Sequence, residues 1–325
     1  MFPVIFGIIN SMEEKVFVVF NTTSIGDVLV TNTLVQNIKY YYPESKVVFV
    51  CNSPMLDVAK YQDGVDDVVS YKKEDLKSII SIWKYASGFP YKKPFASFVT
   101  YSNERNLIIS RLIGSKHIIS HHKFKLWNTR EKFQMKEYTH MKDRWGGLIE
   151  PLTGEHKNLP IKYIPPEVET SVIEQIKNLK NPVPISPTSN FKRKDMRVKD
   201  CAELISILNK EGFTPVMTGA GETARNFNSE LRSAGCTEFT DIVDCTSFVE
   251  IANILKICKC CISVDTGTLH FANALQVPVV GIFYNGLVAN WGSDSALYPS
   301  VMLEGRNVKP QEIVSELKNL IGVCV

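Results

Sequence analysis

The chain has 325 residues, of which 44% are hydrophobic and 22% are charged. This composition is that of an ordinary globular protein, so it excludes a disordered or fibrous chain, and the net charge of +3 excludes a nucleic-acid binder that depends on bulk positive charge. At about 150 residues per domain, the length predicts two domains of similar size.

The ends and the cysteines of the chain indicate a cytoplasmic protein. The apolar run 1–9 is shorter than the ~18 to 20 residues of a membrane-spanning helix, and it lacks the cationic start and cleavage site of a signal peptide. We interpret residues 1–11 as an upstream extension or a loose tail, because a second candidate start, Met12, precedes the first predicted strand. Without a signal peptide, the eight cysteines indicate reduced thiols. We interpret Cys258, Cys260 and Cys261 as buried structural residues, because no second Cys/His cluster stands at the spacing of a zinc site.

The first half of the chain alternates short apolar runs with helical stretches. This alternation is typical of parallel sheets wound with helices, whose ligand loops lie at the carboxyl ends of the strands. We expect strands at Val16–Phe20, Lys46–Cys51, Asp67–Ser70 and Phe95–Thr100, with a polar turn at 21–27 and a helix through Tyr40 after the first strand.

The second half repeats this pattern after a proline-dense stretch, 160–187, that we interpret as the linker. The predicted fold is therefore α/β, with two Rossmann-like doubly wound domains, 1–160 and 161–325, that face a cleft. In the second half, the expected strands are Pro184–Pro187, Thr214–Thr218, Cys260–Val264 and Val279–Tyr284. The expected helices there are Lys199–Glu211, Glu222–Ala234, Leu269–Leu275 and Pro310–Ile321.

The turn after the first predicted strand carries a candidate general base. Its small residues, Ser24 and Gly26 among them, allow a sharp turn that places Asp27 at the opening of a helix, facing the cleft. A carboxylate in that position can accept a proton from a substrate. The alternative is that Asp27 only complements the helix dipole while Ser24 or Thr23 caps the helix.

A second motif follows a predicted strand in the C-terminal half. Thr266, Gly267 and Thr268 stand where a strand turns into a helix, so their N–H groups form a candidate diphosphate site. The alternative is that Asp265 or Thr266 caps a structural helix and that His270 is an ordinary buried histidine.

The two motifs together resemble those of glycosyltransferase family 9, the bacterial heptosyltransferases of the lipopolysaccharide core. The first loop of this family is similar to T-S-S-hydrophobic-G-D, which residues 22–27 match with small changes. The donor motif of the family is similar to D-T-G-x-x-H-hydrophobic-A-x-A-L-x-x-P, which residues 265–278 match at every fixed position. The resemblance implies a GT-B fold, with an acceptor-binding domain at 1–160 and a nucleotide-sugar-binding domain at 161–325.

The resemblance also implies site residues. A lysine before a helix of the second domain would neutralise the diphosphate, with Lys194 the better match and Lys192 the second, although such a cluster is more often a solvated surface. Glu222, after a Gly-rich turn, would bind the ribose. The implied donor-binding residues are Thr188, Ser189, Lys192, Lys194, Gly219, Glu222, Asp265, Thr266, Gly267, Thr268 and His270, and the implied acceptor-binding residues are Ser24, Gly26, Arg105, His140 and Arg144.

The reaction implied is an inverting transfer of heptose from ADP-heptose, with Asp27 as the base and with no metal or other cofactor. The implied acceptor is a lipid-linked glycan of the lipid A-Kdo core, reached at the inner-membrane surface, and no nucleic acid is involved. The stretch 116–144, with eight Lys or Arg against three acidic residues, would suit a phosphorylated acceptor, or it is an irregular basic loop.

One loop departs from the family pattern. Residues 283–288 read Phe-Tyr-Asn-Gly-Leu-Val where the family usually carries G-P-T-x-P, near the donor sugar and the acceptor. A hexosyltransferase that uses another nucleotide-sugar therefore stays open, as does a nucleotide-sugar epimerase. A non-catalytic sugar-nucleotide or lipid-binding protein is disfavoured, because Asp27 stands beside an intact 265–270 motif.

Overall fold

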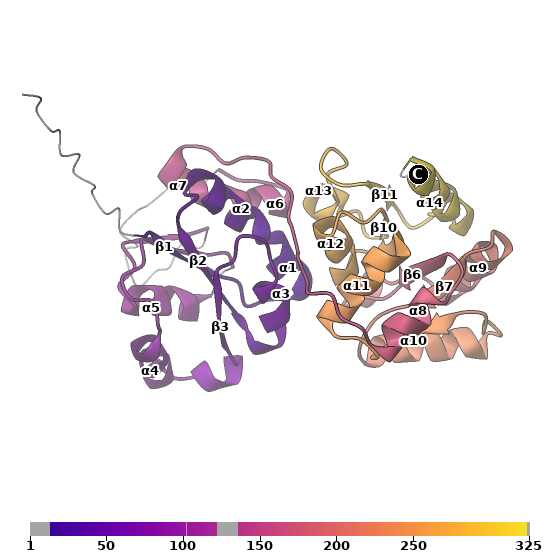
Figure 1. The fold of residues 1–325 in the computed structure, drawn as a ribbon, viewed down its shortest axis with the longest axis horizontal. Helices are drawn as coiled ribbons and strands as arrows, with labels where there is room; N and C mark the ends of the chain where they lie inside the picture. The colour runs from indigo at the N-terminus through magenta and orange to yellow at the C-terminus, as the bar shows by residue number, and fades with distance from the viewer. Residues whose placement is uncertain (1–13, 102, 122–135, 324–325) are drawn as a thin grey trace, which may run out of the picture.

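The computed structural model describes residues 14–101, 103–121 and 136–323, so the predicted tail at 1–11 lies outside the described residues. These residues form two units, each built on one parallel sheet (Figure 1). The first sheet has five strands in the order β3-β2-β1-β4-β5, and the second has six in the order β11-β10-β9-β6-β7-β8. The first sheet contains β1 (Val16–Phe20), β2 (Lys46–Asn52), β3 (Asp67–Tyr71), β4 (Ala96–Val99) and β5 (His117–Ser120).

Helices cover both faces of the first sheet because its central strands are apolar on both faces. In β1, Phe17 and Val19 pack into one core while Val18 and Phe20 pack into another. The first core is covered by α1 (Ile25–Val30), α2 (Asn32–Tyr41), α3 (Leu56–Lys60), α6 (Met141–Gly146) and α7 (Glu150–Thr153), and the second by α4 (Ile79–Gly88) and α5 (Glu104–Leu112).

The second unit follows the same plan. Its strands are β6 (Pro182–Ser186), β7 (Thr214–Met217), β8 (Thr240–Asp241), β9 (Cys261–Val264), β10 (Val279–Phe283) and β11 (Ser300–Glu304). Its helices are α8 (Ser171–Lys177), α9 (Val198–Lys210), α10 (Glu222–Ser233), α11 (Phe248–Cys258), α12 (Gly267–Ala274), α13 (Val288–Trp291) and α14 (Pro310–Val323). None of the described helices combines the length and apolarity that crossing a bilayer requires. The expected α/β fold with two doubly wound units is confirmed.

The proline-dense stretch is only partly a linker. An extended connection runs over 154–170, and the predicted domain boundary at 160/161 falls within it. The later part of the stretch forms α8 and the central strand β6, so the sequence prediction placed the linker too far along the chain. Pro182 and Pro184 are tolerated in β6 because β9 pairs only with Ile185 and Ser186, beyond both prolines.

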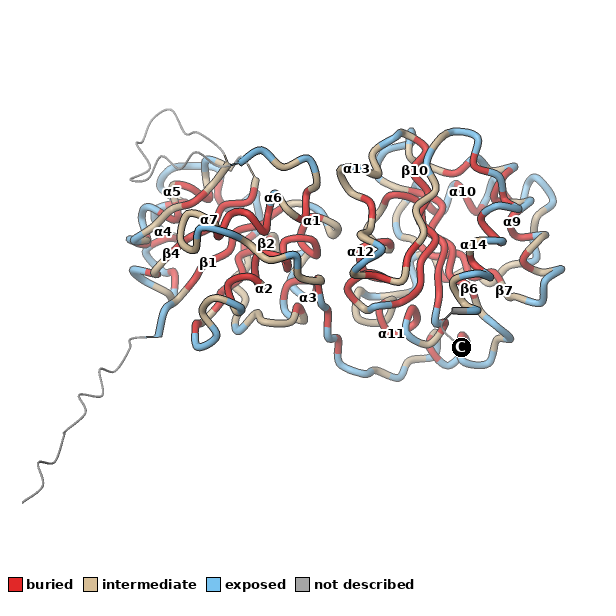
Figure 2. Tube along the Cα trace, turned by 90° about the horizontal axis from the view of Figure 1, so that it is seen from above, coloured by how far each residue is buried: buried red, intermediate tan, exposed pale blue. Residues whose placement is uncertain are grey.

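One cluster of buried side chains contains residues of both units, and α1 and α12 face each other where the units meet (Figure 2). Tyr163 of the connection packs edge-on against Phe271 of α12, with ring centroids 5.2 Å apart, and its N–H donates to the carbonyl of Ala274. Because α1 and α12 are also packed against each other, the loops that follow β1 and β9 meet between the units.

Candidate functional site

Asp27 lies in the first turn of α1 and is buried, and both of its carboxylate oxygens accept hydrogen bonds. The Ser24 hydroxyl donates to Oδ2 at 2.7 Å, and the Tyr101 hydroxyl donates to Oδ1 at 2.8 Å. Ser24 occupies the N-cap position of α1, but its side chain makes no cap hydrogen bond and donates to the Asp27 carboxylate instead. The carboxylate therefore has a fixed orientation, as a general base requires.

Tyr101 is a site residue that the sequence analysis missed. It follows Thr100 at the carboxyl end of β4, and its ring packs against Trp145 with centroids 5.1 Å apart. Burial and the neighbouring Asp27 carboxylate raise the pKa of Tyr101, so the phenol stays protonated and keeps donating. Its position just beyond a predicted strand was the available signal, since ligand loops of parallel sheets lie there.

The second motif lies at the transition from β9 to α12. Asp265 is buried, and Lys194 Nζ lies 2.6 Å from its Oδ2. The Lys194 side chain is 15% exposed and the Asp265 side chain is 4% exposed. Lys192, the second-choice lysine, is exposed. Thr266 occupies the N-cap position of α12, and its side chain makes no cap hydrogen bond. The N–H groups of Gly267 and Thr268 belong to the first helical turn, which has no carbonyl partners within the helix.

The amino ends of α1 and α12 meet closely because both carry a glycine. A Cβ added at Gly26 would lie 2.6 Å from Cδ2 of His270, and one added at Gly267 would lie 3.1 Å from Cγ2 of Ile25. His270 is buried at this contact; burial lowers its pKa, whereas the charges of Asp265 and Asp27 both raise it. The charges of Asp27 and Asp265, which stand on different units, therefore both act on the His270 side chain.

We expect Gly26→Ala to lower the free energy of unfolding by about 1–3 kcal/mol, the usual cost of overpacking a well-packed site. The added methyl would collide with the His270 ring, which cannot easily yield because it is buried and packs against Trp291, with centroids 5.8 Å apart. Urea denaturation measures the change. Gly88→Ala is the matched control, since nothing lies within 4 Å of its added Cβ, and equal midpoints for both variants would contradict the close contact.

The other predicted donor residues lie on loops at the carboxyl edge of the second sheet. Gly219 and Thr188 are neighbours, since a Cβ at Gly219 would lie 3.9 Å from the Thr188 Oγ1. Ser189 N donates to Asp195 Oδ1 at 2.7 Å, which shapes the loop after β6. Glu222 is the exposed first residue of α10. The roles of these four residues in donor binding stay predictions.

The Gly-rich turn before Glu222 is held by a residue that the sequence analysis did not single out. Gly221 N donates to Asp244 Oδ1 at 2.7 Å, and Asp244 N donates to the carbonyl of Gly219. The hydrogen bond from Gly221 N and the nearby Arg225 lower the pKa of Asp244, so its carboxylate stays charged. Asp244 thereby fixes the backbone of the turn.

The predicted acceptor residues of the first unit are spread along its carboxyl edge. Arg105 lies 5.9 Å from the ring centroid of Tyr71, the last residue of β3, and the exposed Arg144 lies 5.6 Å from that of Trp145. His140 instead faces the second unit: its Nδ1 accepts from Lys142 N at 3.1 Å and its Nε2 lies 2.8 Å from the Gly292 carbonyl. Residues 122–135 of the predicted basic stretch 116–144 lie outside the described residues.

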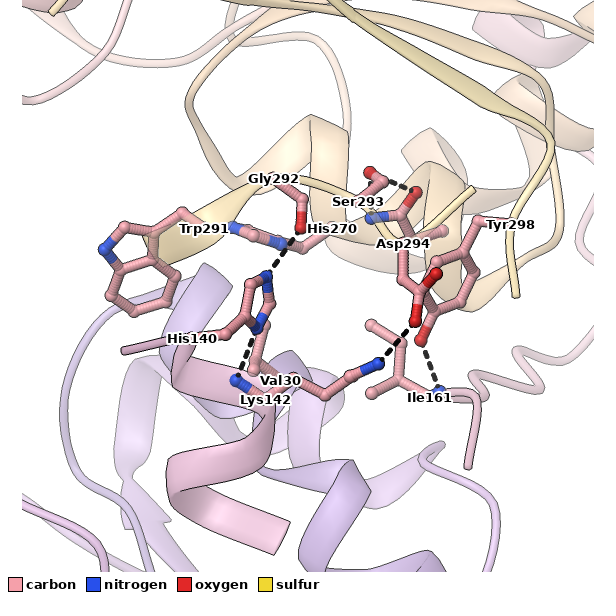
Figure 3. Close-up of a pocket in the computed structure, with 11 residues that line it drawn as sticks. Val30, His140, Lys142, Ile161, His270, Trp291, Gly292, Ser293, Asp294 and Tyr298 are labelled. Carbon is pink, nitrogen blue, oxygen red and sulfur yellow. Dashed lines mark hydrogen bonds and ion pairs between the residues drawn. The ribbon is translucent and has the colours of Figure 1, made fainter. Parts of the chain in front are cut away.

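A small cavity between the units lies beside His270 (Figure 3). Its volume of about 20 Å³ is room for one water molecule, so it is not large enough for a sugar. Lys142 Nζ lies 3.0 Å from Asp294 Oδ2, and Asn158 Nδ2 donates to the same oxygen at 3.1 Å. The hydrogen bond from Asn158, together with Lys142, lowers the pKa of Asp294 to about 2. The network is a polar contact that joins the two units.

The cysteines behave as structural residues. Cys258, Cys260 and Cys261 are buried, and burial raises the pKa of each thiol, that of Cys260 to about 12. Protonated thiols are poor metal ligands. Within the described part of the chain, no three His, Cys, Asp or Glu side chains are grouped so that they could hold a metal ion.

Comparisons with known proteins agree with the motifs. The model of glycosyltransferase family 9 (heptosyltransferase) matches residues 108–319, a range that contains the 265–278 motif but not the Asp27 loop. No curated protein sequence matches the chain.

Solved structures share the fold at low sequence identity. A glycosyl transferase family 9 protein from Veillonella parvula has a TM-score of 0.81 at 16% identity over 95% of this chain and 98% of its own. The ADP-heptose lps heptosyltransferase II of E. coli has a TM-score of 0.73 at 15% identity over 95% and 99%. The E. coli heptosyltransferase WaaC, solved with ADP, has a TM-score of 0.73 at 15% identity over 94% and 99%. Because the family model covers most of the chain and the fold agrees throughout, the chain belongs to glycosyltransferase family 9 and is a glycosyltransferase with a GT-B-like fold.

Proposed function

We propose that this glycosyltransferase moves a heptose from ADP-heptose onto a hydroxyl of a lipid-linked glycan, with inversion at the anomeric carbon. The observation that carries the proposal is the meeting of α1 and α12, which sets the held carboxylate of Asp27 across from the Lys194–Asp265 pair. The structural neighbours named above include two E. coli heptosyltransferases, one of them with ADP, which supports an adenine nucleotide as the donor's leaving group.

In this proposal the acceptor hydroxyl gives its proton to a carboxylate oxygen of Asp27 as its own oxygen attacks the anomeric carbon. The bond between that carbon and the diphosphate oxygen breaks, so the new glycosidic bond forms on the opposite face of the sugar and ADP leaves. In this proposal Lys194, which is paired with Asp265, and the N–H groups at the start of α12 take up the charge of the diphosphate. The protein's own groups thus stabilise the negative charge of the leaving diphosphate. We propose no metal or cofactor for this reaction.

The acceptor in this proposal lies along the carboxyl edge of the first sheet. Asp27 follows β1 and Arg105 lies in the first turn of α5, after β4, so a base and a cation share that edge. A phosphorylated glycan would be attracted to Arg105 and Arg144. We propose the lipid A-Kdo core as this acceptor, met on the cytoplasmic face of the inner membrane.

Selective stabilisation by nucleotides tests the donor. We expect ADP to raise the melting temperature more than UDP or GDP at equal concentration, because a ligand that binds only the folded state stabilises it by about 2.7 kcal/mol at a hundred times its dissociation constant. A thermal-shift series with the three nucleotides and their sugars measures this.

A preference for UDP would contradict the heptose donor and favour a hexosyltransferase, the second candidate. The observation that favours it is the loop between β10 and α13, where Asn285 and Gly286 stand in place of the family's G-P-T-x-P segment and lead to Trp291 beside His270. Product analysis with donor alone separates both transferases from an epimerase, since an epimerase converts its donor without an acceptor.

A further inference from the structure

The outer face of α4 exposes large apolar side chains. Ile79 is 63% exposed, Ile80 is 75% exposed and Trp83 is 60% exposed, whereas Ile82 and Ala86 of the same helix are buried in the sheet's second core. Residues 79, 80 and 83 lie within one turn, so the three exposed side chains form one apolar surface. Exposed aliphatic and indole groups gathered in this way mark a surface that contacts an apolar partner.

Exposed lysines flank this apolar surface along the chain. Between 72 and 93 the chain carries six Lys against two acidic residues, Glu74 and Asp75. None of the four lysines nearest to it in sequence forms an ion pair with a carboxylate in the part of the chain that the structure describes. The α4 patch is defined as Ile79, Ile80 and Trp83 together with the exposed Lys72, Lys73, Lys77 and Lys84.

The amino end of α4, where the patch begins, lies near the carboxyl edge of the first sheet, which carries the candidate acceptor residues. The chain leaves the carboxyl end of β3 at Tyr71 and starts α4 eight residues later, so the amino end of α4 stays near that edge. Tyr71 contacts α5 directly, since its hydroxyl donates to Asn106 Oδ1 at 2.6 Å, and Arg105 lies over its ring. The helix lies on the side of the first unit that is turned away from the second unit (Figures 1 and 2).

We propose that the α4 patch docks this protein onto an anionic lipid bilayer. Isoleucine side chains would enter the boundary between headgroups and acyl chains, and Trp83 would lie at headgroup depth, where indole rings are favoured. The flanking lysines would attract anionic headgroups. Each lysine that lies within a Debye length of the membrane surface would contribute to binding. A protein partner fits less well, because lysine is depleted from protein interfaces relative to the rest of the protein surface.

Docking through this patch deepens the proposed function and rests on it for the lipid-linked acceptor. With α4 on the bilayer, the carboxyl edge that carries Asp27 and Arg105 would lie close to the membrane. An acceptor anchored by its lipid would then need to extend only its sugar head toward Asp27. The second unit, on the far side, would stay free to bind a donor from solution.

Vesicle binding by the full chain tests the proposal. We expect the protein to co-sediment with vesicles of phosphatidylcholine mixed with phosphatidylglycerol and much less with phosphatidylcholine alone, and we expect salt to weaken the binding. The double variant Ile80→Ser and Trp83→Ser should bind at least about tenfold more weakly, because it removes most of the apolar contact. Ile164→Ser is its matched control, since Ile164 is 63% exposed on the connection between the units.

A charge-reversal pair separates attraction to lipid headgroups from a general charge effect. Lys77→Glu with Lys84→Glu should weaken binding to the anionic vesicles at least about tenfold, whereas Lys210→Glu with Lys256→Glu, exposed on the second unit and equal in charge change, should not. Brominated lipids should quench the tryptophan fluorescence of the wild-type chain and quench that of Trp83→Phe much less.

Equal binding to both vesicle types, unchanged binding by the α4 variants, or quenching that persists in Trp83→Phe would overturn the proposal. So would a wild-type dimer that the α4 variants dissociate, because a second copy would then cover the patch. Transfer to a delipidated, water-soluble acceptor and the thermal shift with ADP should stay unchanged in the α4 variants. Failure of those two assays with vesicle binding intact would count against the proposed function and not against the docking surface.

Discussion

Asp27→Asn is expected to lower the rate of glycosyl transfer by about 10²- to 10⁴-fold, the range that a positioned general base contributes. The amide has the shape of the carboxylate and can still accept the hydrogen bond from Tyr101, but it cannot take the proton of the acceptor hydroxyl. Donor binding should stay close to that of the wild type, because the groups assigned to the diphosphate lie on the other unit. Transfer under single-turnover conditions and the thermal shift with ADP measure the two effects separately.

Tyr101→Phe and Ser24→Ala are the matched variants for that experiment, since each removes one hydrogen bond to the Asp27 carboxylate and leaves the carboxylate itself. Each should lower the rate by about tenfold, consistent with the worth of one hydrogen bond to a charged group. Wild-type turnover in Asp27→Asn would remove this residue from the reaction. Full activity in both matched variants would show that the carboxylate needs no positioning by them.

Lys194→Met is expected to destabilise the fold by about 3–5 kcal/mol, because it leaves the carboxylate of Asp265 buried without its cation. The same change should weaken the binding of ADP, since it removes the ammonium group that we assign to the diphosphate. Lys192→Met is the matched control: it deletes an exposed lysine from the same short helix, Lys192–Lys194, and should change neither quantity noticeably.

The double variant Lys194→Met with Asp265→Leu distinguishes structure from function in this pair. Replacing both partners removes the unpaired charge, so the free energy of unfolding should recover most of the loss, while affinity for ADP should not recover. Urea denaturation and calorimetric titration with ADP provide the two measurements. A stable Lys194→Met chain, or a double variant as unstable as the sum of the single ones, would contradict a coupled buried pair.

Local patterns in the sequence were enough to predict the central strands. The predicted Val16–Phe20 strand agrees with β1 residue for residue, and the 279–284 run agrees with β10 except for its last residue. Both are long apolar runs, because a central parallel strand is buried on both faces. The edge strands β5, β8 and β11 were missed because most of their residues are only partly buried, so their composition carries a weaker apolar signal.

The sequence also determined where the two site loops begin. Asp27 and Asp265 both stand where an apolar run gives way to a small-residue turn, and the structure places each at a strand-to-helix transition. That inference needs only the local preference of glycine and of small polar residues for sharp turns. The family resemblance rested on the same two segments.

Tertiary structure alone decided which of these residues meet. Tyr101 reaches Asp27 across 74 residues because β4 pairs with β1 in the sheet. The local sequence of either segment does not reveal that these two strands are neighbours. The pairing of Lys194 with Asp265, and the close contact of Gly26 with His270, likewise depend on how loops and whole units pack. Conformational preference acts within a few residues, whereas contacts between distant side chains depend on the packing of complete sheets and helices, which only the folded chain determines.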